Sequence, residues 1–252
     1  MKKTLTIFTV ILFLLISAKT NAQGDFRVGI SMGSVIPVHE FKNNDYKNLP
    51  AGFAQSGFNL SFDGDYYFIN RMAVSARFNF GMSSMDKVAV SDWLDNQMAD
   101  YLNSELDKNL YSIDYWQWSA PMLGLKYNYP LVLNKLYLEV AGFSGLSIVQ
   151  TPSQNLKIID TENKQSIYSE NIAGKSLSVP FMFDAGFRYL AADNIQLKLQ
   201  AGYFQTQVSY EHVNYIVKDE ANEIWKELKR NQQKVPLKTL TLSIGIIYKL
   251  EF

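Results

Sequence analysis

Apolar and polar residues alternate with a period of two along most of this chain, and the C-terminal segment shows this most clearly. From Leu240 to Phe252 every even-numbered residue is apolar or aromatic, and every odd-numbered residue except Ile247 is small or polar. A period of two predicts a β-strand with one apolar face and one polar face. The segment also has the roughly 9–11 residues that a tilted strand needs to cross a bilayer.

Seven earlier segments alternate in the same way, which brings the predicted strands to about eight, an even number as in single-chain bacterial barrels. They are Asp25–Ile36, Ala54–Phe68, Arg71–Met82, Ile113–Tyr129, Lys135–Gln150, Ser176–Tyr189 and Asn194–Val208. The fourth is the noisiest because Pro121 lies in its middle, and a proline there predicts a sheet edge or a bulge.

The connectors between these segments alternate strictly between long and short. The short ones lie around residues 69–70, 130–134 and 190–193, and the long ones around 37–52, 83–112, 151–175 and 209–236. An up-and-down outer-membrane barrel with both termini in the periplasm predicts this order, with short periplasmic turns and longer extracellular loops. The predicted fold class is therefore all-β, a single eight-stranded antiparallel up-and-down transmembrane β-barrel with four long extracellular loops.

Two of the long connectors contain apolar residues at helical spacing. Ser91–Leu106 has such residues every three or four positions, with Ser91 available as an N-cap, and Glu220–Arg230 is a shorter candidate. We therefore expect one or two short helices in these loops. They would pack across the barrel mouth, or alternatively bind a partner.

Periodicity alone does not say which face of the barrel points outward, and a secreted lipocalin-like barrel would place its apolar face inside. Here the polar faces are rich in Gly, Ser and Asn with isolated charges, which suits a narrow interior. Aromatic residues lie near the ends of the segments, where an interfacial girdle would place them. They are Phe26, Phe68, Tyr127, Tyr129, Tyr189, Tyr203, Tyr248 and Phe252. These features favour a membrane barrel with a polar lumen.

A polar lumen would enclose charged side chains from seven segments. Because buried charges must be paired, we predict internal ion pairs among them. The residues are Arg27, Asp63, Arg77, Lys126, Glu139, Asp184, Arg188 and Lys198. An eight-stranded barrel has an interior just wide enough for side chains to fill, so a general diffusion pore is not expected.

The N-terminus predicts export. Lys2 and Lys3 precede an apolar run from Leu5 to Ile16, and a small residue follows at Ala22, as in a secretory signal peptide. We expect cleavage after Ala22 and a single mature domain over residues 23–252. The chain has no cysteine, which excludes disulfides, thiolate metal sites and a lipoprotein anchor.

Charge and motifs add little further chemistry. The chain has 24 Lys and Arg against 24 Asp and Glu, with no basic stripe, which argues against nucleic acid as a partner. No spacing typical of a metal, phosphate or dinucleotide site appears, so neither a metal nor another cofactor is expected. Ser209, Glu211 and His212 are close in sequence, but spacing alone is weak evidence for acyl-transfer catalysis. His39 is expected to be a solvated loop residue.

Five segments resemble the small outer-membrane barrels of the OmpA/OmpX type and particularly the PorT-like barrel family. They are Asn21–Gln23, Phe26–Ile30, Pro121–Tyr127, Gly186–Tyr189 and Ile246–Phe252. The resemblance spans nearly the whole mature chain and implies insertion by the outer-membrane assembly machinery. It implies no activity, because these families share a barrel pattern rather than catalytic residues.

The sequence therefore predicts an integral protein of the bacterial outer membrane with a structural, adhesive or envelope-assembly role, and not an enzyme. Its expected partners are outer-membrane lipid, the assembly machinery, and an envelope or extracellular protein bound through the long loops. Trp93 and Trp225 are the loop aromatics that we expect to make such contacts. An outer-membrane lipid-processing enzyme remains the alternative, followed by a lipocalin-like carrier.

Overall fold

The computed structural model describes most of the chain beyond its first 24 residues. The described residues are 25–43, 52–69, 71–90, 92, 107–113, 115–132, 135–152, 154–160, 165–171, 174–218 and 224–250. Within them, the backbone alone is described for 107–113, 154–160, 165–171, 210–218 and 224–233. The predicted signal peptide lies outside these residues.

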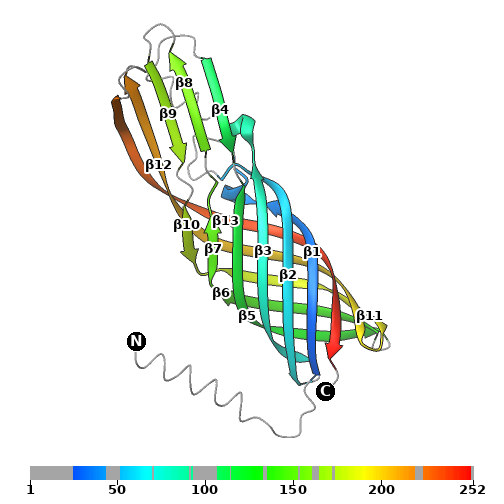
Figure 1. Ribbon diagram of the computed structural model, residues 1–252. Helices are drawn as coiled ribbons and strands as arrows, with labels where there is room; N and C mark the ends of the chain where they lie inside the picture. Colours follow the sequence, from blue (N-terminus) through cyan, green and yellow to red (C-terminus); the bar gives the residue numbers. More distant parts are fainter. Residues whose placement is uncertain are drawn as a thin grey trace, which may run out of the picture.

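Eight antiparallel strands close into a ring, which confirms the predicted fold class (Figure 1). In order around the ring they are β1 (Asp25–Pro37), β2 (Ala54–Ile69), β3 (Met72–Met85), β5 (Trp116–Val132), β6 (Leu136–Gly145), β11 (Phe181–Ala192), β12 (Ile195–Lys218) and β13 (Ile224–Leu250). β1 closes the ring by pairing with β13 from Phe26↔Leu250 to Pro37↔Thr239. Each of the eight predicted segments corresponds to one of these strands, and two of the strands, β12 and β13, extend well past the predicted ends.

The two ends of the barrel differ. At one end, the turn end, short connectors join β2 to β3, β5 to β6 and β11 to β12, as the sequence predicts. At the other, the extended end, β6 continues into β7 (Ser147–Gln150) and β10 (Lys175–Ser178) leads into β11. The break between β6 and β7 lies opposite Pro121, whose carbonyl accepts a hydrogen bond from Leu146 N at 3.1 Å. The proline thus occurs where the neighbouring strand is interrupted, as its missing donor requires.

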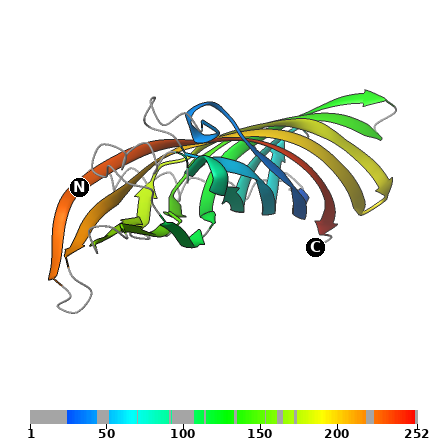
Figure 2. The ribbon, with the colours of Figure 1, turned by 90° about the horizontal axis from the view of Figure 1, so that it is seen from above.

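β12 and β13 continue far beyond the ring as one long hairpin. Three further strands join its β12 side in the order β9 (Gln165–Asn171), β8 (Gln154–Asp160) and β4 (Asp107–Ile113). We call β4, β8, β9 and the outer parts of β12 and β13 the extended sheet. Seen from above, the outer ends of β12 and β13 lie to one side of the ring (Figure 2).

The extended sheet corrects two predictions. Residues 209–236 are not a long loop, because β12 pairs with β13 up to Lys218↔Ile224. The predicted helix over Glu220–Arg230 is wrong, since residues from Ile224 onward belong to β13 and pair across this hairpin. Backbone pairing with β12 overrides a weak local preference for helix. The connector 151–175 likewise contains β8 and β9.

The predicted helix Ser91–Leu106 lies outside the described residues except for Asp92. The part of its connector that is described contains a single helical turn over 87–90 and the strand β4. A short 3-10 helix, η1 (His39–Phe41), lies in the connector between β1 and β2.

Candidate functional site: the filled lumen and the extended end

The apolar face of the barrel points outward. Along β13, Leu242, Ile244 and Ile246 are 56%, 63% and 53% exposed, whereas Thr241 and Ser243 between them are buried. The other ring strands show the same arrangement, with exposed Val, Leu, Ile and Phe opposite buried polar residues. This is the reverse of a lipocalin-like barrel, so that alternative is wrong for these strands. An apolar surface that surrounds the whole barrel matches hydrocarbon as the surrounding solvent.

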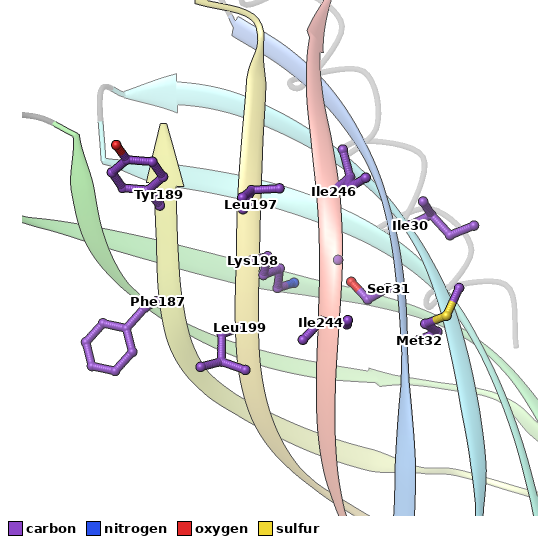
Figure 3. A pocket seen from close by; sticks show the side chains of 11 residues that line it. Ile30, Ser31, Met32, Phe187, Tyr189, Leu197, Lys198, Leu199, Ile244 and Ile246 are labelled. Carbon is purple, nitrogen blue, oxygen red and sulfur yellow. The ribbon is translucent and has the colours of Figure 1, made fainter. Parts of the chain in front are cut away.

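The outer wall has a shallow groove of about 590 Å³ across β11, β12, β13 and β1 (Figure 3). Leu197, Leu199, Ile244 and Ile246 are among the apolar side chains along it, and Gly245 lies in its floor. A Cβ at Gly245 would collide with Ser31 on the neighbouring strand, so close strand packing requires glycine there. The groove is a shallow depression in the apolar outer wall.

Exposed aromatic residues gather toward the turn end of the barrel. Phe68, Tyr127, Tyr129, Tyr189 and Tyr248, which the sequence assigned to a girdle, are 37% to 50% exposed. Of the other residues assigned to it, Phe26 and Tyr203 are half-buried, and Phe252 lies outside the described residues. A belt of amphipathic rings is typical of the boundary between hydrocarbon and water.

Asp63 of β2 lies at the centre of an ion-pair network inside the lumen. Its carboxylate accepts hydrogen bonds from Arg77 Nε at 2.6 Å and from Arg77 Nη2 at 3.0 Å. Lys126 Nζ and Lys198 Nζ each lie 3.1 Å from Asp63 Oδ2. The three cations come from β3, β5 and β12, so this one carboxylate connects four strands. None of the four side chains is more than 3% exposed.

The network continues to the opposite wall. The guanidinium that contacts the central carboxylate also pairs with Asp184 of β11. Lys198 Nζ lies 3.3 Å from Glu139 Oε1, and Arg188 Nη1 lies 3.7 Å from Glu139 Oε2. Arg188 also donates a hydrogen bond of 2.7 Å to the Tyr67 hydroxyl. The predicted internal ion pairs are thus confirmed.

Arg27, the remaining predicted lumen cation, lies nearer the turn end. Its guanidinium pairs with Asp25 at 3.2 Å and lies 4.2 Å above the Tyr67 ring. Sequence reasoning did not single out Asp65, which pairs with Lys126 at 2.8 Å, or Tyr67. Both occupy the same face of β2 as Asp63, so strand alternation could have found them.

The half of the lumen toward the extended end is closed by apolar side chains, which the sequence analysis missed. Trp118 of β5 stacks on Phe204 of β12 at 5.9 Å between ring centroids. Trp116 makes an edge contact with Phe41 of η1 at 5.4 Å. All four are buried. We call this group, with the residues that surround it, the apolar plug; its other members include Val35, Met85, Met122, Phe143, Val149, Met182, Val208, Val235 and Leu237.

The connector between β1 and β2 folds over the apolar plug. Trp116 Nε1 donates to Gly52 O at 3.1 Å, and Gly52 N donates to Glu40 O at 3.0 Å. The Glu40 carboxylate accepts a hydrogen bond of 2.8 Å from Lys238 Nζ on β13. This bond from Lys238 lowers the pKa of the Glu40 carboxyl below its ordinary value. His39 has a left-handed backbone with φ of 54° and is exposed, as predicted.

The predicted contact and catalytic candidates are only partly described. Trp93 lies outside the described residues. Trp225 belongs to β13, and His212 belongs to β12 opposite Asn171 of β9, but only their backbones are described. Ser209 N donates to Ser176 Oγ at 3.2 Å. Contacts by the two tryptophans and catalysis at His212 therefore stay untested.

The part of the chain that the structure describes contains no cluster of three or more metal-ligating side chains of the His, Cys, Asp or Glu type. Within the same residues, no helix is both long enough and apolar enough to cross a membrane.

No protein-family model matches the chain, and neither does any curated protein. Its structure is similar to the outer membrane protein OprG from Pseudomonas aeruginosa, with a TM-score of 0.44, 15% identity, and coverage of 91% of this chain and 97% of that one. It is similar to a major outer membrane protein from Thermus thermophilus, with a TM-score of 0.42, 13% identity, and coverage of 90% and 100%. It is also similar to the outer membrane protease OmpT from Escherichia coli, with a TM-score of 0.43, 8% identity, and coverage of 93% and 100%. At these identities the likeness concerns the barrel fold alone, and the resemblance to the PorT-like family stays a prediction.

Proposed function

We propose that this protein is an integral, non-enzymatic barrel of the bacterial outer membrane with a structural, adhesive or envelope-assembly role. One observation carries the proposal: side chains of the ring strands alternate between an exposed apolar wall and a buried, ion-paired lumen. Exposure of such an apolar wall to water would be unfavourable, whereas contact with hydrocarbon would not. Closed barrels also satisfy every backbone hydrogen bond inside a bilayer.

The lumen does not serve as a general diffusion channel in this proposal. The ion-pair network fills it toward the turn end, and the apolar plug fills it toward the extended end. The barrel would then act as a scaffold. Its outer-membrane lipid surroundings hold it in place, and the assembly machinery inserts it during biogenesis.

The extended sheet is the part of the molecule that the scaffold displays. We infer that the turn end and both termini face the periplasm and that the extended sheet projects outside the cell. There it would bind an envelope or extracellular protein, with Trp93 and Trp225 as candidate contact residues. Nucleic acid is not expected as a partner, because the chain carries no net charge.

Cell fractionation combined with gel migration tests the proposal. The mature protein should sediment with outer membranes and migrate differently before and after heating in detergent, because the closed barrel resists unfolding. A protease added to intact cells should cleave in the extended sheet and leave the ring intact. A mature chain that stays folded and monomeric in buffer without detergent would refute the membrane assignment.

The non-enzymatic part of the proposal has its own test. Replacing His212 with Ala should leave the rate of phospholipid and lipopolysaccharide hydrolysis in outer membranes unchanged. A loss of hydrolysis in this variant, with unchanged gel migration, would instead support the lipid-processing alternative.

A further inference from the structure

Among the strands that the structure describes, none pairs with one side of the outer hairpin of β12 and β13, which we call the open side. On its β12 side, β9 pairs with residues His212–Lys218. On its β13 side, β1 pairs only as far as Thr239, followed by a hydrogen bond of 3.1 Å from Val38 N to Lys238 O. Beyond that point, no described strand pairs with this side of β13. The stretch from Ile224 to Lys234 is about 30–35 Å long at strand spacing, far longer than the edges that proteins usually leave unpaired.

The hydrogen-bond register shows which residues of β13 point their backbone N–H and C=O groups toward the open side. Lys238 O accepts from the β1 side, whereas Lys249 N donates to Asn194 O, in the turn that leads into β12. Both backbone groups of a residue in an antiparallel strand point to the same side, and successive residues alternate. Between Lys238 and the register shift near Lys229, the backbone groups of even-numbered residues of β13 therefore point toward the open side. Arg230, Gln232 and Lys234 each present an N–H and a C=O there.

Pro236 is consistent with this assignment. Its position is even, so the donor that proline lacks would have pointed to the open side and not toward β12. Proline in a strand is tolerated where it removes no ladder bond. It also limits pairing close to the barrel and leaves the stretch from Lys234 outward as the part able to accept a strand.

The sequence of the open stretch indicates what kind of strand would fit. Between Ile224 and Lys234 it contains Lys226, Lys229, Arg230 and Lys234 against the single acidic residue Glu227. Lysines on an edge oppose pairing with an identical edge, because like charges directly opposite destabilise a sheet. The same charges attract an acidic strand. A second copy of this chain is thus disfavoured and an acidic segment is favoured.

We propose that the open side of β13 between Ile224 and Lys234 binds an extended, acidic segment of a partner protein by adding it as a further strand. Main-chain hydrogen bonds to Arg230, Gln232 and Lys234 would supply the register, and the basic residues would supply the preference for acidic sequences. This inference rests on the proposed role of the extended sheet as the contact surface.

The test uses the mature protein in lipid nanodiscs and fluorescent eight-residue peptides of alternating Glu and Val or alternating Lys and Val. Fluorescence anisotropy should show saturable binding of the acidic peptide, about tenfold or more tighter than that of the basic peptide. Raising the salt concentration should weaken the binding, because exposed charges are screened.

Two substitutions of Gln232 distinguish the contribution of its backbone to peptide binding from that of its side chain. Gln232→Pro removes a donor from the open side only and should weaken acidic-peptide binding about tenfold or more. Gln232→Ala keeps the donor and should bind like the wild type. Hydrogen exchange should show the β12–β13 ladder intact in both variants.

Three outcomes would overturn the inference. They are equal binding of the two peptides, unchanged binding by Gln232→Pro, or self-association of the protein through this edge. Failure of the proposed function looks different, because the protein would then not enter the nanodisc or show heat-dependent gel migration at all.

Discussion

Asp63 is the residue on which the interior of the barrel depends most directly. It is the shared partner of Arg77, Lys126 and Lys198, each within 3.1 Å of its carboxylate. Removing one partner of a buried ion pair lowers stability far more than removing one partner of a surface pair, because the remaining charges stay buried without compensation. Asp63 thus determines whether the buried charges of the lumen compensate one another or destabilise the fold.

Asp63→Asn should therefore destabilise the folded barrel by about 3–5 kcal/mol, since the isosteric amide leaves three cations with one carboxylate fewer. Urea unfolding of the protein in vesicles, followed by tryptophan fluorescence, measures the change. The double variant Asp63→Asn/Lys198→Met should recover part of the loss because one of the excess charges is gone. A single variant as stable as the wild type would show that water or ions reach the lumen and screen its charges.

The ion pair between Glu40 of the β1–β2 connector and Lys238 of β13 predicts that stability depends weakly on pH. The hydrogen bond from Lys238 lowers the pKa of the Glu40 carboxyl. Its contribution to stability is thus complete above the ordinary carboxyl pKa and is lost as the pH falls through the lowered value. The unfolding midpoint of the wild type should exceed that of Glu40→Gln slightly at pH 7, and the two should converge once the pH has fallen below the lowered pKa of this carboxyl. A difference that persists in acid would rule out this carboxylate as its source.

Single residues also show where sequence reasoning reaches its limit. Strand alternation placed all eight predicted charged residues in the lumen, because a polar group on an otherwise apolar outer wall would be costly. The same alternation did not reveal that Trp116 and Trp118 point inward. An aromatic side chain is stable both in a membrane girdle and in a dry interior, so its identity does not select a face.

At the scale of elements, the eight ring strands were predictable and the extended sheet was not. A ring strand has lipid on one face and a filled lumen on the other, and these two environments impose a regular alternation on its sequence. The outer parts of β12 and β13 have no such surroundings. Their strand conformation depends on pairing between residues such as Val217 and Trp225 and with β9, which local sequence does not encode.

This contrast predicts that the outer hairpin can be removed without loss of the barrel. Val208 and Val235 are direct partners across the hairpin and both are fully buried in the apolar plug. Replacing residues 209–234 with Asn-Gly would join these partners by a two-residue turn that suits a hairpin. The shortened protein should keep its heat-dependent gel migration and its β-sheet circular dichroism. Loss of both would show that the ring requires the extended sheet to fold.

The same variant provides a control for binding to the extended sheet. Acidic-peptide binding should disappear with the hairpin even though the barrel persists. Peptide that still binds the shortened protein would locate the contact elsewhere, for example on the connector between β1 and β2.

At the scale of the whole molecule, two different fillings close the barrel in series. Along β3, Gly81 lies opposite Trp118 in the apolar plug, and Arg77 lies opposite Met122 four residues nearer the turn end. A Cβ at Gly81 would collide with the Trp118 indole, so the plug is packed against the wall itself. Ions that enter from the extended end would first meet an apolar, aromatic layer and then a network that is already charge-balanced.

Series closure predicts a specific pattern in planar-bilayer recordings. The wild type should show no stable open conductance. Trp118→Ala/Phe204→Ala removes the stacked pair of the apolar plug, and Arg77→Ala/Asp184→Ala removes one cation and one anion that join opposite walls. Each double variant should stay closed because the other filling remains, whereas the combined quadruple variant should conduct. An open pore in the wild type, or in only one double variant, would show that a single layer or none closes the barrel, and gel migration would confirm that every variant tested is folded.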